Sequence, residues 1–221
     1  MYNMAAFDFG VKVDPHLFER SLDATIPMNI QQYLKQAWQM FRENIGAFLG
    51  FTLTLFAVWL ATSMVDAGSS LLFSSVAAPF YAGYSIVAFR LMLRQPFQFS
   101  DFFRGFNYFL PLFLASLAST LLVSIGLVLL LIPGIYLAIC YMFTTFLVID
   151  YRMEFWQAME ISRKIISRNW FAFFLFALVL CFVNLLGALA FGIGLLVTLP
   201  VTSCAVAVAY KEIVGLNAST W

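Results

Sequence analysis

The chain has 221 residues, of which 63% are hydrophobic and only 10% are charged, and its mean hydropathy is +0.92. A soluble domain carries about 25% charged residues, so this composition excludes an ordinary water-soluble protein. The formal net charge of +1 gives no reason to expect nucleic acid as a partner. The composition therefore predicts an integral membrane protein.

Residues 1–27 form an N-terminal arm in which apolar and charged residues are mixed. The arm is too short to bury a core of its own. Alternation from Phe7 to Val13 fits a short strand or an extended segment docked on another subunit, and a flexible, solvated terminus is the alternative. No apolar core with a small-residue cleavage site precedes the first predicted span, so we expect no cleaved signal peptide.

Two amphipathic helices are predicted, each just before a long apolar run. Their apolar stripes recur at helical spacing and consist of Ile30, Tyr33, Leu34, Ala37, Trp38 and Phe41, and of Phe155, Ala158, Met159, Ser162, Ile165 and Ile166. We expect both helices to lie in the membrane interface, with the apolar stripe at the acyl boundary and basic groups near lipid phosphates. The candidate lipid-interface residues are Trp38, Arg42, Trp156, Arg163, Lys164 and Arg168. The aromatic segment 100–106 is predicted as a shorter counterpart.

Three long stretches carry almost no charge: Glu43 to Arg90, which contains only Asp66, Arg104 to Asp150, and Arg168 to Lys211. Each is long enough for two crossings of about 20 residues, and unbroken apolar runs favour helices over a barrel. The sequence therefore predicts an all-α membrane protein with six transmembrane helices arranged as three hairpins. The expected spans are Gly46 to Val65, Ser70 to Phe89, Tyr108 to Ile125, Leu127 to Ile149, Trp170 to Ala190 and Gly194 to Tyr210.

Basic residues avoid the three predicted outer turns, at residues 66–69, near Gly126 and at residues 191–193. The positive-inside rule then places both termini in the cytoplasm or in the equivalent compartment of an organelle. Arg90 and Asp150 fall just beyond the inner ends of spans, where they can reach water or lipid headgroups.

A repeated unit is suggested within a single membrane domain at 28–221, with boundaries 28–94, 95–150 and 151–214. Each unit enters its hairpin at an asparagine (Asn44, Asn107, Asn169) and has one proline in the returning helix (Pro79, Pro133, Pro200), where we expect a kink. The hairpins can close around a pseudo-threefold axis or pack as a plain six-helix bundle. The sequence does not choose between the two.

Chemistry inside the predicted spans is sparse. Their polar residues are mostly small, which packing between membrane helices explains, and Asn184 is the exception that could line a solute path. His16 is the only histidine, and no nucleotide loop, paired-cysteine motif or nucleophile elbow is present. We therefore expect a protein that is not an enzyme and that needs no cofactor or metal.

Four segments carry a family resemblance: Leu131-Ile132-Pro133-Gly134-Ile135-Tyr136-Leu137, Trp156-Gln157-Ala158-Met159-Glu160-Ile161-Ser162-Arg163, residues 192–200 and residues 209–212. They resemble a group of bacterial membrane proteins of unknown function that is similar to the membrane domain of some glycerophosphodiester phosphodiesterases. The resemblance covers the second half well and the first half only in architecture. It implies a six-helix membrane domain, in a bacterial inner membrane or an equivalent one, without the soluble phosphodiesterase domain.

The sequence leaves two functions in competition. The first is a non-catalytic membrane scaffold or accessory subunit that engages membrane lipids, a larger membrane complex or a second copy of itself through its interfacial helices and arm. The second is a passive channel or transporter for a small or lipid-like solute. An enzyme acting on lipid ranks last, because no nucleophile, base or metal cluster is visible.

Overall fold

All regular elements of the described chain are helices. The computed structural model describes residues 10, 12–14, 18, 28–63, 70–190, 192–217 and 220, without the side chains of residues 59, 61–63 and 70–76. The helices are α2 (Ile30–Glu43), α3 (Ile45–Ser63), α4 (Ser70–Met92), η3 (Phe99–Tyr108), α5 (Phe109–Leu129), α6 (Leu131–Cys140), α7 (Thr144–Tyr151), α8 (Phe155–Arg168), α9 (Trp170–Leu189) and α10 (Leu195–Ile213).

Four helical segments of the described chain are long and apolar enough to cross a membrane: Phe99–Leu129, Leu131–Tyr151, Trp170–Leu189 and Leu195–Ile213. A shorter apolar helix covers Ile45–Val58. The chain is therefore all-helical and has the helices of a membrane-inserted protein. Part of the first predicted hairpin lies outside the described residues, so six spans in three hairpins stay a prediction.

The turn between α5 and α6 lies at Leu130, which is extended at φ −157° and ψ 128°, and not near Gly126 as predicted. Gly126 remains inside α5 and faces Gly134 of α6. A Cβ at Gly126 would lie 2.9 Å from the Gly134 Cα atom, so a side chain there would push the two helices apart. This glycine therefore marks a close helix contact, a role that small residues take in membrane helices.

The predicted fourth span is interrupted at residues 141–143, between α6 and α7. Pro133 is the third residue of α6, where the backbone N–H would have no partner in the helix anyway. Its ring therefore removes no helical hydrogen bond, and the interruption falls a few turns later. Pro79 and Pro200, by contrast, lie inside α4 and α10.

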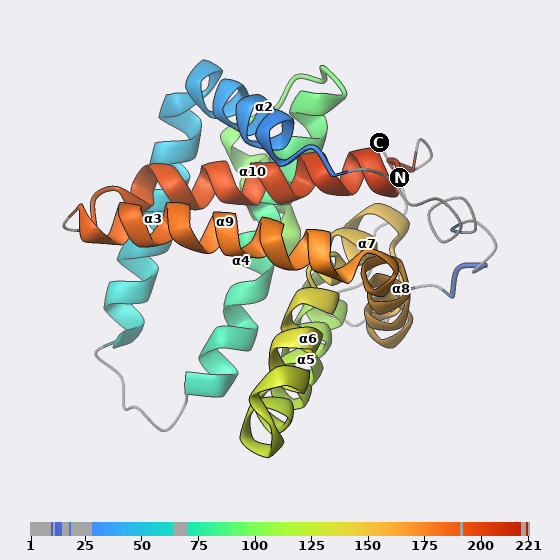
Figure 1. Cartoon of the computed structure of the whole chain (residues 1–221). Coiled ribbons are helices and arrows are strands. Elements are labelled where there is room, and N and C mark those ends of the chain that lie inside the picture. Colours follow the sequence, from blue (N-terminus) through green and yellow to red (C-terminus); the bar gives the residue numbers. More distant parts are fainter. Residues whose placement is uncertain are drawn as a thin grey trace.

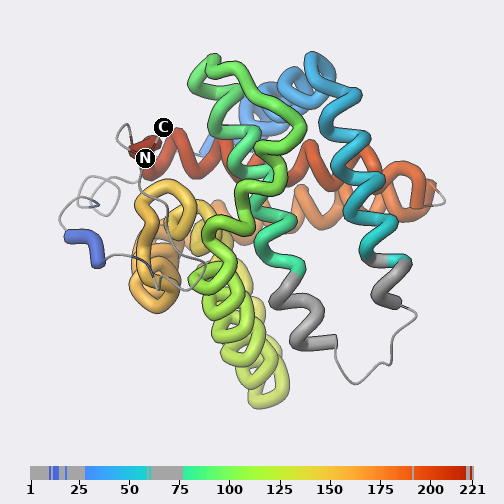
Figure 2. Tube along the Cα trace, turned by 180° about the vertical axis from the view of Figure 1, so that it is seen from behind, coloured from blue at the N-terminus to red at the C-terminus, as the bar shows by residue number. Residues whose placement is uncertain are grey.

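The helix pairs do not share one direction. Figure 1 shows α9 and α10 side by side and running across α3, α4 and the α5–α6 pair, and Figure 2 shows the same crossing from behind. Helix α10 lies centrally and contacts α2, α9, α4 and α3, which explains why much of it is buried. The three returning helices thus have different surroundings, and a threefold repeat of the whole chain is not established.

Candidate functional site

The two amphipathic helices turn most of their apolar stripes inward, onto the protein. Helix α2 buries Tyr33, Ala37 and Phe41 and packs on α10. Helix α8 buries Ala158, Met159, Ile161, Ser162, Ile165 and Ile166 and packs on α5, α6 and α7. The expectation that these stripes meet lipid acyl chains is therefore wrong for their buried residues, because neighbouring helices already cover them, whereas Trp38 of the α2 stripe is exposed.

The candidate interface residues lie on the outward faces of the same helices. The side chains of Trp38 and Trp156 are 49% and 58% exposed, which is unusual for tryptophan. Arg42, Lys164 and Arg168 are exposed as well. Each amphipathic helix therefore presents a tryptophan and basic groups away from the core, and lipid headgroups or a partner are the kinds of surface that such residues contact.

Arg163 and Lys164 flank an acidic residue on α8. The Arg163 guanidinium donates from Nε and Nη2 to Glu160 at 3.0 and 2.8 Å, and the Lys164 Nζ lies 3.6 Å from the same carboxylate. The hydrogen bond from Arg163 holds the pKa of Glu160 below its ordinary value of 4.5. Two cations around one carboxylate leave this face of α8 with an excess of positive charge.

The described part of the N-terminal arm docks on α8 of the same chain. The Val13 backbone N–H donates to the Gln157 side-chain carbonyl at 2.9 Å, and the Gln157 amide donates back to the Val13 carbonyl. Phe18 is buried and meets the Tyr151 ring edge to face at 4.9 Å. A cavity of about 520 Å³ lies beside this contact and is lined by Lys12, Phe18, Glu154, Phe155, Trp156, Gln157, Glu160, Ile161 and Lys164.

Ser162 is a structural residue that the sequence pattern placed only in an apolar stripe. Its buried hydroxyl donates to the Cys140 carbonyl at 2.6 Å and accepts from the Phe143 N–H at 3.2 Å. These are backbone groups freed by the break between α6 and α7. A broken helix in a membrane protein needs such a partner, and α8 supplies it.

Asn184 lies in the contact between α9 and α10. Its amide nitrogen is 3.3 Å from the hydroxyl oxygen of Thr202, and that hydroxyl also donates to the Thr198 carbonyl at 2.8 Å. A hydrogen bond between neighbouring helices accounts for this polar side chain without a solute path.

Three aromatic rings meet where α4, α7 and α10 converge. Phe89, Phe146 and Tyr210 are almost fully buried, and their centroids are 5.8, 5.6 and 5.4 Å apart in the three pairs. A sequence signal for two of these rings was available, because Val87-Ala88-Phe89-Arg90 resembles Val208-Ala209-Tyr210-Lys211, and each segment follows its helix proline at the same distance.

Asp150, expected to reach water or headgroups, is completely buried at the end of α7. Its carboxylate accepts a hydrogen bond from the Tyr210 hydroxyl at 3.0 Å and one from the Asn217 N–H at 3.2 Å, and its carbonyl accepts from the Thr220 hydroxyl at 2.6 Å. A buried carboxylate needs partners of this kind. Asp150 therefore fixes the segment after α10 against the core.

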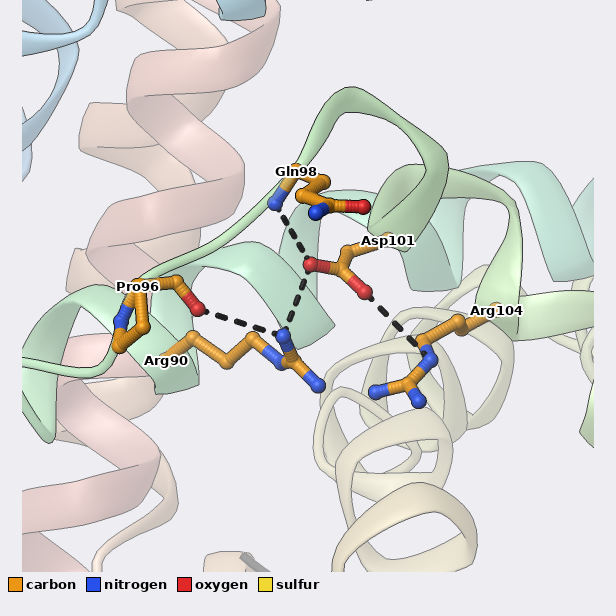
Figure 3. A network of polar contacts seen from close by, with 5 residues as sticks. All are labelled: Arg90, Pro96, Gln98, Asp101 and Arg104. Carbon is orange, nitrogen blue, oxygen red and sulfur yellow. Dashed lines mark hydrogen bonds and ion pairs between the residues drawn. The ribbon is translucent and has the colours of Figure 1, made fainter.

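A second polar cluster joins the end of α4 to η3, and Figure 3 shows it from close by. The Arg90 guanidinium donates to the Asp101 carboxylate at 2.8 Å, the Gln98 N–H donates to the same oxygen at 2.7 Å, and Arg104 lies 3.4 Å from the other oxygen. Next to it, backbone contacts at Gly83 and Gly105 bring η3 directly onto α4. The ion pairs therefore hold η3 on the helix that precedes it.

In the part of the chain that the structure describes, no three His, Cys, Asp or Glu side chains gather as metal ligands would. His16 lies outside the described residues. The features that stand out are thus the exposed tryptophans and basic groups of α2 and α8, the docked arm and the ion pairs of η3. No protein-family model, curated protein or solved structure matches the chain.

Proposed function

We propose that this chain is a non-catalytic integral membrane scaffold or accessory subunit. It engages phospholipid, a larger membrane complex or a second copy of itself through the outward faces of α2 and α8 and through the arm docked on α8. Nucleic acid is not among the partners, because the net charge is only +1.

One observation carries the proposal. Trp38 and Trp156 are about half exposed although each helix buries several other apolar residues against the protein. Leaving a tryptophan in water is costly, so a residue of this kind next to exposed basic groups favours an interface with headgroups or with another protein.

The proposal includes a topology. Six spans in three hairpins place both termini in the cytoplasm, with the protein in a bacterial inner membrane or an equivalent one. The cyclic packing of the interfacial elements supports the repeated unit, because α2 lies on α10, η3 on α4 and α8 on α6 and α7. Each interfacial element thus covers the returning helix of the preceding unit.

Native mass spectrometry after purification in mild detergent tests the function. We expect the wild-type protein to retain phospholipid or a partner chain, and Trp156→Ala to retain clearly less. Phe171→Ala is the matched control, since it removes an aromatic side chain that is 72% exposed but lies on α9. A bare monomer from the wild-type preparation would contradict the proposal.

The alternative, a passive channel or transporter, has less support. Its residue Asn184 is hydrogen bonded to Thr202, and aromatic rings fill the space where three returning helices meet. Flux into liposomes separates the two functions. Flux above that of empty vesicles, lowered by Asn184→Leu, would favour the channel.

A further inference from the structure

Two arginines share one carboxylate at the junction of α4 and η3 (Figure 3). Asp101 accepts from Arg90 at Oδ2, at 2.8 Å, and its Oδ1 lies 3.4 Å from the Arg104 Nε. The Gln98 N–H also donates to Oδ2, and the Pro96 carbonyl accepts from Arg90 at 3.4 Å. Both carboxylate oxygens are therefore engaged, and the cluster is fixed on the protein side.

The same cluster is unbalanced in charge and in hydrogen bonds. Two guanidinium groups face one carboxylate, which leaves one excess positive charge. The Nε of Arg90 is buried and has no hydrogen-bond partner among the described residues. In Figure 3 the second terminal nitrogen of Arg90 and one terminal nitrogen of Arg104 point toward each other on the side of Asp101 away from Gln98, and no drawn contact reaches either of them. Donors that converge without a partner favour an anion.

The surroundings select the kind of anion. The Arg104 side chain is 43% exposed, so the cluster is open to a ligand on that side. Phe99 and Phe106, at 45% and 36% exposure, lie on the same helix η3. This helix begins the apolar segment Phe99–Leu129, which is long enough to cross a membrane. A guanidinium group and exposed aromatic rings on one helix at the start of a span are suited to the headgroup region.

We propose that Arg90 and Arg104 bind the phosphate of an anionic phospholipid, with Phe99 and Phe106 against its glycerol and upper acyl region. The inference rests on the proposed function and deepens it, because it assigns a lipid site to η3 in addition to the faces of α2 and α8. The lipid phosphate supplies the negative charge that the cluster lacks. Its non-bridging oxygens also accept paired hydrogen bonds from the planar, forked guanidinium groups.

Binding of short-chain lipids to the full-length protein in a non-ionic detergent tests the site. The probes are dioctanoyl phosphatidylglycerol, dioctanoyl phosphatidylcholine and inorganic phosphate, and bound ligand is counted by native mass spectrometry. We expect phosphatidylglycerol to bind the wild-type protein best. Arg104→Gln should weaken that binding about tenfold, because it removes a charged donor from the ligand. Arg104→Lys should recover part of the loss.

Arg94→Gln is the matched control, because it removes an equal charge from an exposed position close to the end of α4. We expect it to change binding less than twofold. Equal losses of phosphatidylglycerol binding in Arg94→Gln and Arg104→Gln would mean that only general electrostatic attraction holds the lipid, and would overturn the site. Inorganic phosphate that competes as well as the lipid would overturn it too. If wild-type protein retains phospholipid but Arg104→Gln binds like wild type, only the site fails. If the wild type binds no phospholipid at all, the lipid part of the proposed function fails with it.

Discussion

Helices α2 and α8 are built alike and used differently. Both have 14 residues, and both end at an asparagine with nearly the same backbone conformation, φ −131° and ψ 33° at Asn44 and φ −130° and ψ 42° at Asn169. In both, the asparagine N–H donates to the carbonyl three residues back, and the asparagine carbonyl accepts from the next helix. We call the junction at each of these asparagines an elbow, and the two elbows have equivalent backbone structures.

What the two helices cover is different. Counted back from the two asparagines, Ala37 and Ser162 occupy the same position, and both are fully buried. Ala37 belongs to a stripe that packs on the unbroken helix α10, whereas Ser162 lies on the break between α6 and α7. The same helix position is therefore occupied by an apolar residue where it packs on an unbroken helix, and by a polar residue where it packs on a helix break whose backbone groups need a partner. The following experiments test this comparison.

The largest effect is expected for Ser162→Ala. The substitution leaves the Cys140 carbonyl and the Phe143 N–H buried without their partner, and we expect a loss of about 2 kcal/mol in the free energy of unfolding. Unfolding by SDS in mixed micelles measures it. Ser167→Ala on the exposed side of α8 is the control and should change stability little. An equal loss in both variants would remove the assigned role of Ser162.

The reverse exchange, Ala37→Ser, should cost about 1 kcal/mol in the same measurement. A serine hydroxyl at this position finds no helix break and can bond only within its own helix, so it is buried with little gain. If Ala37→Ser instead raises the free energy of unfolding, α10 must present an unpaired backbone group that the serine hydroxyl can bond.

The elbow asparagines give a smaller difference. The Asn44 side-chain amide donates to the Met40 carbonyl at 3.0 Å, one of the last carbonyls of α2, whereas the Asn169 side chain makes no capping hydrogen bond among the described residues. We expect Asn44→Ala to lose about 0.5 kcal/mol and Asn169→Ala to lose less. Thermal unfolding of both variants decides the order, and an equal loss would mean that the backbone conformation alone selects asparagine.

The smallest effect is expected for the ion pair between Glu160 and Arg163 on α8. The pKa of Glu160 is lowered in the folded state by Arg163, so the pair stabilises the protein above pH 4.5, the ordinary pKa, and this contribution disappears as the pH falls through the lowered value. The side chains are partly exposed, so Glu160→Gln should cost only a few tenths of a kcal/mol at pH 7. Melting curves of both proteins should converge as the pH falls through the lowered pKa of Glu160. A constant difference across this range would contradict the pairing.

Much of the local structure could be read from the residues. The period of apolar side chains predicted most of the buried residues of α2 and α8, because a helix places every third or fourth residue on one face, but it also included Trp38, which is exposed. The pattern did not say what covers those stripes, since lipid chains and neighbouring helices are equally apolar. The charge-free runs likewise predicted long apolar helices. They did not predict the break at residues 141–143, where the Ser162 hydroxyl of α8 bonds the freed backbone groups.

The sequence by itself determined that the chain is helical, apolar and charged mainly outside its long apolar runs, because hydrophobicity and helical period are properties of neighbouring residues. Only the tertiary structure decided that α9 and α10 cross the other helices, that Gly126 serves a helix contact rather than a turn, and that Asp150 is buried. These features depend on contacts between different helices, which range from the neighbouring helices α5 and α6 to residues as far apart as Asp150 and Tyr210. The tertiary structure also brings Arg90, Asp101 and Arg104 together. These residues come from α4 and η3, which are in backbone contact at Gly83 and Gly105.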